Sequence, residues 1–332
     1  MSQFDVAHEL VEQRPRPTAD LPAHADMIWI PGGTFVMGSD QHYPEERPAH
    51  RVTLDGFWID RTPVTNQQFR SFARATGHVT FAEIPPDTAQ YPGALPHMLY
   101  AGSLVFMPPR QLRGLDDWSQ WWSFLKGANW RRPTGPGSNL GGKDTHPVVH
   151  IAYADALAYA RWAGKDLPTE AEWEFAARGG LHAAEYAWGD ELVPDGAHMA
   201  NIWQGQFPLE NLGADGYERT SPVTAFPPNG YGVHDMIGNV WEWTSDWWSA
   251  RHEPDAAKPC CIPRNPRGGV EANSLDPRQP AIRIPRKVLK GGSHLCAPSY
   301  CRRYRPAARH AEPVDTSTSH VGFRCVLRNG SQ

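Results

Sequence analysis

The chain has 332 residues, a net charge of −4 and a pI of about 6.4. Its length allows one large domain or two ordinary ones, and its balance of charge gives no electrostatic case for nucleic-acid binding. No run approaches the 18 apolar residues of a membrane helix, and the N-terminal sequence lacks the pattern of a signal peptide. Five cysteines, an odd number, argue against a secreted disulfide framework. We therefore expect a cytoplasmic protein, monomeric, with neither a nucleic-acid partner nor a membrane partner.

The first part of the chain predicts a loose lead-in followed by short strands. Residues 1–25 are polar and lack a useful period, so we expect them to be flexible. A single domain is predicted over 26–330. Its first strands are expected at Met27–Ile30, Thr34–Met37 and Arg51–Asp60, the first two around a Pro-Gly-Gly turn.

Three helices follow, and two of them carry a strong start signal. Thr65 with Gln68 and Thr169 with Glu172 each form the capping box in which a threonine begins a helix. Glycines that follow these segments are candidates to end them. The alanine-rich stretch Tyr153–Ala163 predicts the remaining helix.

The rest of the chain is rich in turns, glycine and proline. Four tryptophans of the first turn-rich region are expected to anchor core and loops, and a peptide-groove role is the alternative: Trp118, Trp121, Trp122 and Trp130. A Pro/Gly/Arg-rich insert at 251–286 contains the adjacent pair Cys260 and Cys261, which could be redox-active or could scavenge copper and for which we have no strong account. Because strands and helices do not alternate, a doubly wound parallel sheet is excluded. The prediction is a single irregular, loop-rich α+β domain with little regular secondary structure.

The most distinctive feature is the pair Cys296 and Cys301, which stand five residues apart. Neither a helix nor a strand brings side chains at this spacing to one side, so the thiols converge only if the chain turns at Pro298-Ser299. A basic run follows, and nearby cations favour thiolate: Arg302, Arg303, Arg305 and Arg309. Two thiolates brought together can form a disulfide or hold a soft metal such as Cu(I).

The sequence segments around these cysteines resemble those of a known family. GGSHLCAPSYCRRYRPAAR followed by GFRC is similar to the active-site segment of the formylglycine-generating enzymes, also called sulfatase-modifying factors. PGGTFVMGS, PVTNQQF, LPTEAEWEFAARGG, ANIWQGQFP and NGYGVHDMIGNVWEW extend the resemblance to about 27–328. It implies an irregular α+β fold related to C-type lectins, and a catalytic domain over 26–330.

The resemblance also implies a reaction and a set of active-site residues. Cys296 and Cys301 would bind Cu(I), and Ser293, Tyr300 and Trp241 would line the pocket where O2 reacts. The substrate would be the cysteine of a CxPxR segment in an unfolded sulfatase polypeptide, oxidised to the aldehyde Cα-formylglycine, with a thiol reductant as co-substrate. Copper would supply the redox chemistry and the protein the placement of the reactants.

Two structural Ca²⁺ sites are implied in the same way. Both would use the oxygen donors that this ion prefers. The first maps onto the side chains of Asn201 and Asp215 with the carbonyls of Ile202 and Tyr217. The second maps onto Asp235 and Glu242 with Gly238 and Val240.

Other interpretations stay open at this point. An iron-dependent sulfoxide synthase of the ergothioneine type shares this domain, but it carries an additional helical domain and lacks the cysteine pair. A non-catalytic lectin-like binding module needs neither cysteine, and an enzyme of this kind acting on another protein is also compatible with the sequence. Glu46 is a candidate to face the substrate groove, and Cys325 is expected to be a buried free thiol.

Overall fold

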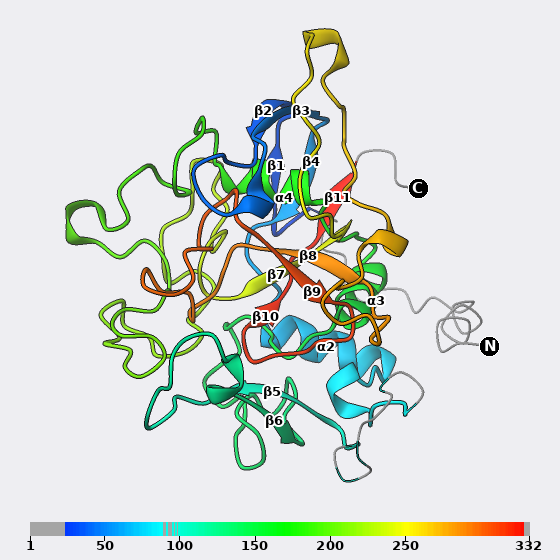
Figure 1. Cartoon of the computed structure of the whole chain (residues 1–332), viewed down its shortest axis with the longest axis vertical. Helices are drawn as coiled ribbons and strands as arrows, with labels where there is room; N and C mark the ends of the chain where they lie inside the picture. The colour runs from blue at the N-terminus through cyan, green and yellow to red at the C-terminus, as the bar shows by residue number, and fades with distance from the viewer. Residues whose placement is uncertain (1–23, 89–90, 92–94, 96, 98, 329–332) are drawn as a thin grey trace.

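The structure is a computed structural model that describes residues 24–88, 91, 95, 97 and 99–328. Of the predicted lead-in at 1–25, residues 1–23 lie outside this described part. Within it the chain forms four small sheets and short helices joined by long loops (Figure 1). None of the described helices is long and apolar enough to cross a membrane. The expectation of one irregular α+β domain is confirmed.

Two small sheets contain the N-terminal strands. One has the order β1-β4-β11 and the other pairs β2 with β3. Their bounds are β1 Met27–Ile30, β2 Gly33–Met37, β3 His50–Leu54, β4 Phe57–Asp60 and β11 Val326–Arg328. Because β11 pairs antiparallel with β4, the end of the described chain closes the sheet that its beginning opens.

The prediction of a single strand over Arg51–Asp60 is wrong. The chain breaks at Asp55 and Gly56, and the two halves belong to different sheets. A Cβ at Gly56 would lie 2.4 Å from the indole of Trp29, so only glycine lets the chain pass this ring. The alternation of apolar residues indicated the strands correctly but did not show this turn.

The three predicted helices are confirmed. They are α2 Asn66–Thr76, α3 Tyr153–Trp162 and α4 Glu170–Ala177. Both capping boxes form, with the hydroxyl groups of Thr65 and Thr169 accepting from the backbone three residues on. Gly77 follows α2 with φ of 69°, the left-handed conformation that commonly ends a helix.

The central sheet has the order β10-β7-β8-β9 (Figure 1). The segment that follows β8 in the sequence contains the cysteine pair. Its strands are β7 Trp241–Trp247, β8 Arg286–Lys290, β9 Arg309–Pro313 and β10 Val321–Gly322. After β8 the chain turns through Gly291 and Gly292, both with positive φ. A Cβ at Gly292 would meet the backbone of Arg303 at 2.9 Å, so this glycine permits the close return of the chain after the cysteines.

The remaining elements are a hairpin and several short turns. The hairpin consists of β5 Gly102–Phe106 and β6 Trp122–Lys126. The described 3-10 helices are η1 Pro44–Glu46, η2 Phe81–Glu83, η4 Trp118–Gln120, η5 Pro194–Gly196, η6 Pro259–Cys261 and η7 Glu271–Asn273. The tryptophans differ in their surroundings: Trp121 and Trp130 are buried, whereas Trp118 is 57% exposed.

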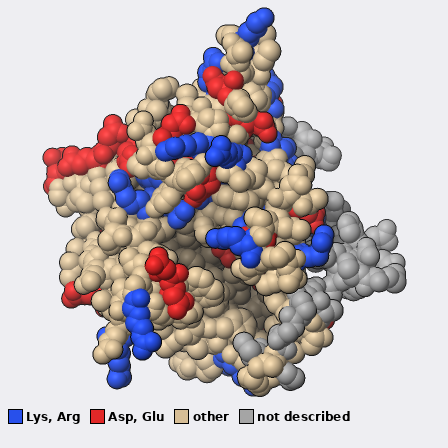
Figure 2. Space-filling view, viewed as in Figure 1, with Lys and Arg blue, Asp and Glu red and all other residues tan. Residues whose placement is uncertain are grey.

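The predicted insert at 251–286 lies outside the sheets except for Arg286, which begins β8. Its first half projects from the body as the arm at the top of Figure 1. On the face drawn in Figure 2, charges of both signs are interspersed, including on this arm. Two isolated bridges, Thr53 with Arg264 and Trp247 with Gly269, join the insert to β3 and β7.

Candidate active site

The loop after β8 brings the two thiols together. The Sγ atoms of Cys296 and Cys301 lie 3.2 Å apart, and both residues are free thiols. The amides of Tyr300 and Cys301 both donate to the carbonyl of Ala297, which closes the predicted turn. This distance is a hydrogen bond between the sulfurs, because a disulfide would bring them to about 2.05 Å.

The two sulfurs differ in protonation. Burial raises the pKa of the Cys296 thiol well above its ordinary value. The hydrogen bond with Cys296 lowers the pKa of Cys301 to about 6, and the Arg303 guanidinium acts in the same direction against burial. Both shifts favour a Cys301 thiolate that accepts a hydrogen bond from the Cys296 thiol.

Only one cation of the basic run faces the thiolate. Arg303 Nη1 lies 4.0 Å from Cys301 Sγ, and its Nη2 donates to Glu45 Oε1 at 2.6 Å. The guanidinium also lies over the ring of Tyr43, 3.9 Å from the centroid. These contacts fix the charge beside the sulfur. The other three arginines are committed elsewhere: Arg302 to Glu185, Arg305 to Glu46 and Arg309 to Glu170.

The expectation that Glu46 faces a groove is wrong. Its side chain is fully buried, and the two carboxylate oxygens accept from Arg305 at 2.5 and 2.9 Å. A buried carboxylate needs such a partner, since desolvation would otherwise be costly. The residue that reaches the site from η1 is its neighbour Glu45, through Arg303.

The three residues expected around the metal lie in different settings. Ser293 is buried, its amide contacts Cys296 Sγ at 3.4 Å, and its hydroxyl accepts from the amide of Leu295. Tyr300 is 38% exposed and stacks on Phe207 with ring centroids 4.4 Å apart. Trp241 starts β7 and is buried, with its ring 5.6 Å from that of His310. Thus Ser293 touches the thiol pair, Tyr300 forms its outer wall, and Trp241 belongs to the sheet behind.

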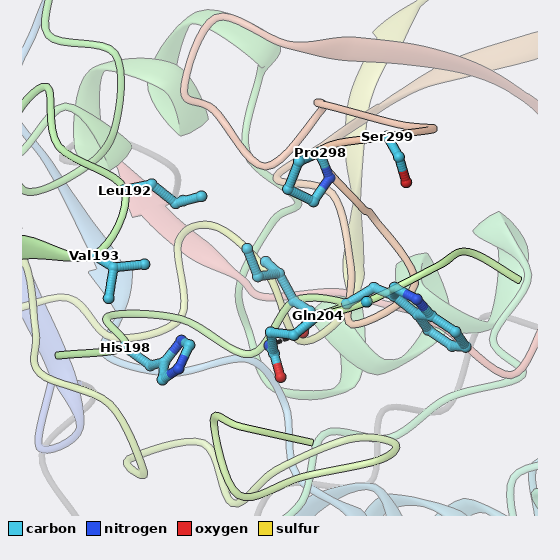
Figure 3. A pocket seen from close by; sticks show the side chains of 9 residues that line it. Leu192, Val193, His198, Gln204, Pro298 and Ser299 are labelled. Atoms are coloured by element: carbon cyan, nitrogen blue, oxygen red, sulfur yellow. Dashed lines mark hydrogen bonds between the residues drawn. The ribbon is translucent and has the colours of Figure 1, made fainter. Parts of the chain in front are cut away.

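A cavity of about 280 Å³ opens beside the turn that joins the thiols. In Figure 3, Pro298 and Ser299 from this turn lie on one side, and Leu192, Val193 and His198 come from another loop. The cavity is mostly apolar. It can take an uncharged side chain of a molecule that approaches Cys301.

The residues of the first implied Ca²⁺ site come together. Asp215 accepts from the amides of Ile202 and Tyr217, and Asn201 Oδ1 is buried without a hydrogen-bond partner. Such an orphaned oxygen beside a carboxylate fits a hard cation. Gln204, absent from the sequence prediction, donates through Nε2 to both Asp215 Oδ2 and the carbonyl of Ile202, so it lies within the same cluster.

At the second implied Ca²⁺ site, only one of the two carboxylates has an oxygen without a partner. Burial raises the pKa of Asp235 to about 7, and its Oδ1 has no partner. Both oxygens of Glu242, however, accept from Arg324 at 2.7 Å, and Trp173 donates to one of them. The Asp235 oxygen fits a cation, whereas the Glu242 side chain already has a cationic partner.

Some residues of the site could not be identified from the sequence. Glu45 and Tyr43 lie more than 250 positions before Arg303 and reach it only through the fold. The only local signal is that YPEERP places two carboxylates next to each other. Cys325 is buried and free, as expected.

Fold and site together define an irregular α+β domain that carries a thiol–thiolate pair beside a fixed cation. Comparison with known proteins identifies the family within this class. A family model described as Sulfatase-modifying factor enzyme 1-like domain matches residues 11–329. The chain belongs to this family.

Several relatives are similar along nearly the whole chain. The Formylglycine-generating enzyme of Mycobacterium tuberculosis is 52% identical, with 91% of this chain and 97% of the relative covered. The protein of the same name from Mus musculus is 44% identical, with 94% and 76% covered. The solved structure of PvdO from Pseudomonas aeruginosa has a TM-score of 0.60 at 24% identity, covering 95% of this chain and all of that one, which shows the fold alone.

Proposed function

We propose that this protein is a formylglycine-generating oxidase that converts a cysteine of a sulfatase polypeptide to Cα-formylglycine. The observation that carries the proposal is the pair Cys296 and Cys301, with sulfurs 3.2 Å apart and the Arg303 guanidinium 4.0 Å from the second sulfur. Relatives named Formylglycine-generating enzyme match over more than nine-tenths of this chain, which supports the same reaction here. The substrate segment is proposed to be CxPxR in a chain that has not yet folded.

Cu(I) suits the donor set of this site. Two sulfur donors favour a soft ion, and Cu(I) tolerates low coordination. Cys296 and Cys301 would supply two ligands, and the third is proposed to be the thiolate of the substrate. Bound there, copper would supply the electron transfer to O2 that the side chains cannot perform.

The residues of the chain prepare the site in three ways. Arg303 stabilises the negative charge on Cys301, and burial of Cys296 and Ser293 keeps water from the inner side of the pair. Tyr300, packed on Phe207 and Trp121, gives the outer side an aromatic wall. The apolar cavity beside Pro298 is proposed to take the proline or another uncharged residue of the substrate.

Calcium is proposed as a structural ion at the first cluster. Asn201, Asp215 and the carbonyl of Ile202 would hold it, and the backbone of this cluster connects to the site, since the amide of Trp203 donates to the carbonyl of Cys296 at 3.0 Å. A cation there would hold the inner cysteine in place. Asp235 is proposed to contribute to a second ion. A cytoplasmic location and a monomeric state stay predictions.

The test uses purified protein loaded with Cu(I) under air with a thiol reductant. A peptide containing Leu-Cys-Thr-Pro-Ser-Arg is added and its mass is followed. We expect loss of the thiol and gain of an aldehyde, absent in Cys296→Ser and Cys301→Ser and retained in Cys260→Ser/Cys261→Ser. An intact peptide with copper-loaded wild-type protein would contradict the proposed substrate.

A further inference from the structure

A second pair of thiols lies far from the first in the fold. Cys260 and Cys261 form the 3-10 helix η6 together with Pro259, and both are exposed free thiols. Their Sγ atoms are 3.6 Å apart. They lie in the first half of the insert, on the arm that projects from the body in Figure 1.

The arm is attached on both sides of η6, so its end is presented in a fixed place. Before η6, Asp255 accepts from the amide of Arg51 at 2.8 Å and from its guanidinium at 3.1 Å. After η6, the carbonyl of Pro263 accepts from the amide of Thr53 at 2.8 Å, and Asn265 donates back to Thr53 at 2.8 Å. The thiols therefore project from strand β3 at the end of a short, anchored loop.

The spacing of the sulfurs suits a shared metal ion. Two thiolates at about 2.3 Å from one ion, the Zn–S distance, stand about 3.8 Å apart in a tetrahedral arrangement and about 4.0 Å apart in a trigonal one. The observed 3.6 Å between Cys260 Sγ and Cys261 Sγ is close to the tetrahedral value, so little rearrangement is needed. Sulfur donors select soft ions, and Cu(I) is among them.

The backbone geometry disfavours a disulfide between these two residues. Neighbouring Cα atoms are about 3.8 Å apart across a trans peptide, below the usual 4.4–6.8 Å span of a disulfide. A bond formed under this constraint is strained and readily reduced, so the dithiol persists in the presence of a thiol reductant.

The other ligands of such an ion must come from outside the arm. Two carboxylates whose ion-pair partners belong to the arm or hold it are occupied, since Asp255 binds Arg51 and Asp55 binds Arg264 and Asn265. Lys258 precedes η6 directly, and its cation complements the negative charge of a bis-thiolate complex. The ion would thus have two protein sulfurs and positions open to an external thiol.

We propose that Cys260 and Cys261 form a second soft-metal site, an exposed two-thiolate site for Cu(I) that is completed by external thiol ligands. Exposure and open coordination make it a site of exchange, unlike the buried pair at the active site. The proposal does not rest on the proposed function, because it concerns different residues and is tested without the active-site thiols.

The experiment measures Cu(I) binding by the full chain in competition with a chromogenic Cu(I) chelator under anaerobic conditions. In Cys296→Ser/Cys301→Ser protein we expect one Cu(I) per chain. Adding Cys260→Ser and Cys261→Ser should remove it, and Cys325 serves as an internal control because it stays in both proteins. Both variants are first compared by circular dichroism, and the exposed positions make misfolding an improbable source of difference.

The result that overturns the proposal is equal binding by the double and quadruple variants. Wild-type protein then provides a check, because two ions per chain are expected from two independent sites. A value of one ion in wild-type protein that is lost in Cys296→Ser/Cys301→Ser would leave only the active-site pair. Failure of the peptide reaction would not affect this measurement, so the two proposals are tested separately.

Discussion

At the scale of single residues, the site depends on the difference in pKa between its two thiols. Cys296 is buried at the inner end of the loop, whereas Cys301 faces Arg303. Burial penalises charge on the first thiol, and the cation stabilises charge on the second. A symmetrical pair would give neither a ready thiolate nor a hydrogen-bond donor to hold it.

The first prediction concerns Arg303. Replacing it with alanine removes the cation and leaves the negative Glu45 nearby, so both changes raise the pKa of Cys301. From a value of about 6, we expect a rise of about one unit or more. The measurement is the rate of iodoacetamide alkylation against pH, in protein that carries Cys260→Ser/Cys261→Ser to remove the exposed thiols.

Two variants serve as controls for this prediction. Arg303→Lys keeps a positive charge and should move the midpoint less. Arg302→Ala removes a cation that is paired with Glu185 and does not contact the thiol, so its midpoint should match that of the parent. An unchanged pH profile in Arg303→Ala would show that the cation does not set the thiolate population.

At the scale of elements, helix α4 is joined to the central sheet by buried charges. Glu174 accepts from Lys290 of β8 at 3.0 Å, from Arg178 at 2.7 Å and from the amide of Gly38 at 2.9 Å. Lys290 immediately precedes the glycine turn that leads to the cysteines. The network therefore fixes the strand from which the active-site loop departs.

The second prediction is that Glu174→Gln destabilises the fold strongly. The change leaves Lys290 and Arg178 as buried, partly unpaired cations, for which a cost of about 3–5 kcal/mol in the free energy of unfolding is typical. The measurement is denaturant unfolding near pH 7. Glu253→Gln, at an exposed position, should differ from wild type by less than about 0.5 kcal/mol, and an equal effect of both changes would contradict the prediction.

The same network makes stability depend on pH. Burial alone would raise the pKa of Glu174, but Lys290 and Arg178 outweigh it and lower the pKa to about 2. Because the folded value lies below the ordinary value of 4.5, the stabilisation is present above pH 4.5 and is lost as the pH falls towards 2. The difference in stability between wild type and Glu174→Gln should therefore shrink through this range.

At the scale of the whole molecule, loops distant in sequence support one another around the thiols. The cluster at Asn201 and Asp215 connects to the active-site loop through the hydrogen bond from Trp203 to Cys296. A domain with few regular hydrogen-bond ladders depends on such hydrogen bonds between loops. An ion that binds only the folded state stabilises the whole protein by mass action.

The third prediction is that Ca²⁺ raises the thermal midpoint of unfolding. At a concentration 100 times its dissociation constant, the ion should add about 2.7 kcal/mol to the free energy of unfolding. Asn201→Ala removes the orphaned oxygen and should reduce the response, whereas Asn273→Ala on η7 should leave it intact. Identical midpoints in Ca²⁺ and in a chelator would exclude a structural calcium.

The sequence by itself determined the helix starts and the turn that brings the cysteine pair together. The capping boxes at Thr65 and Thr169 depend only on residues three positions apart, and the turn between Cys296 and Cys301 depends on Pro298 and Ser299. The family resemblance also rested on short sequence motifs, and the match to the family model confirms it. These features are local, so a single stretch of chain contains their cause.

The tertiary structure decided which charges meet the thiolate and where the strands separate. Four arginines follow Cys301, and only Arg303 faces it, because Glu46, Glu170 and Glu185 bind the others from remote parts of the chain. In the same way, the break at Gly56 depends on a ring placed by another strand. Burial and ion pairing are properties of residues brought together by the fold, and no spacing along the chain reveals them.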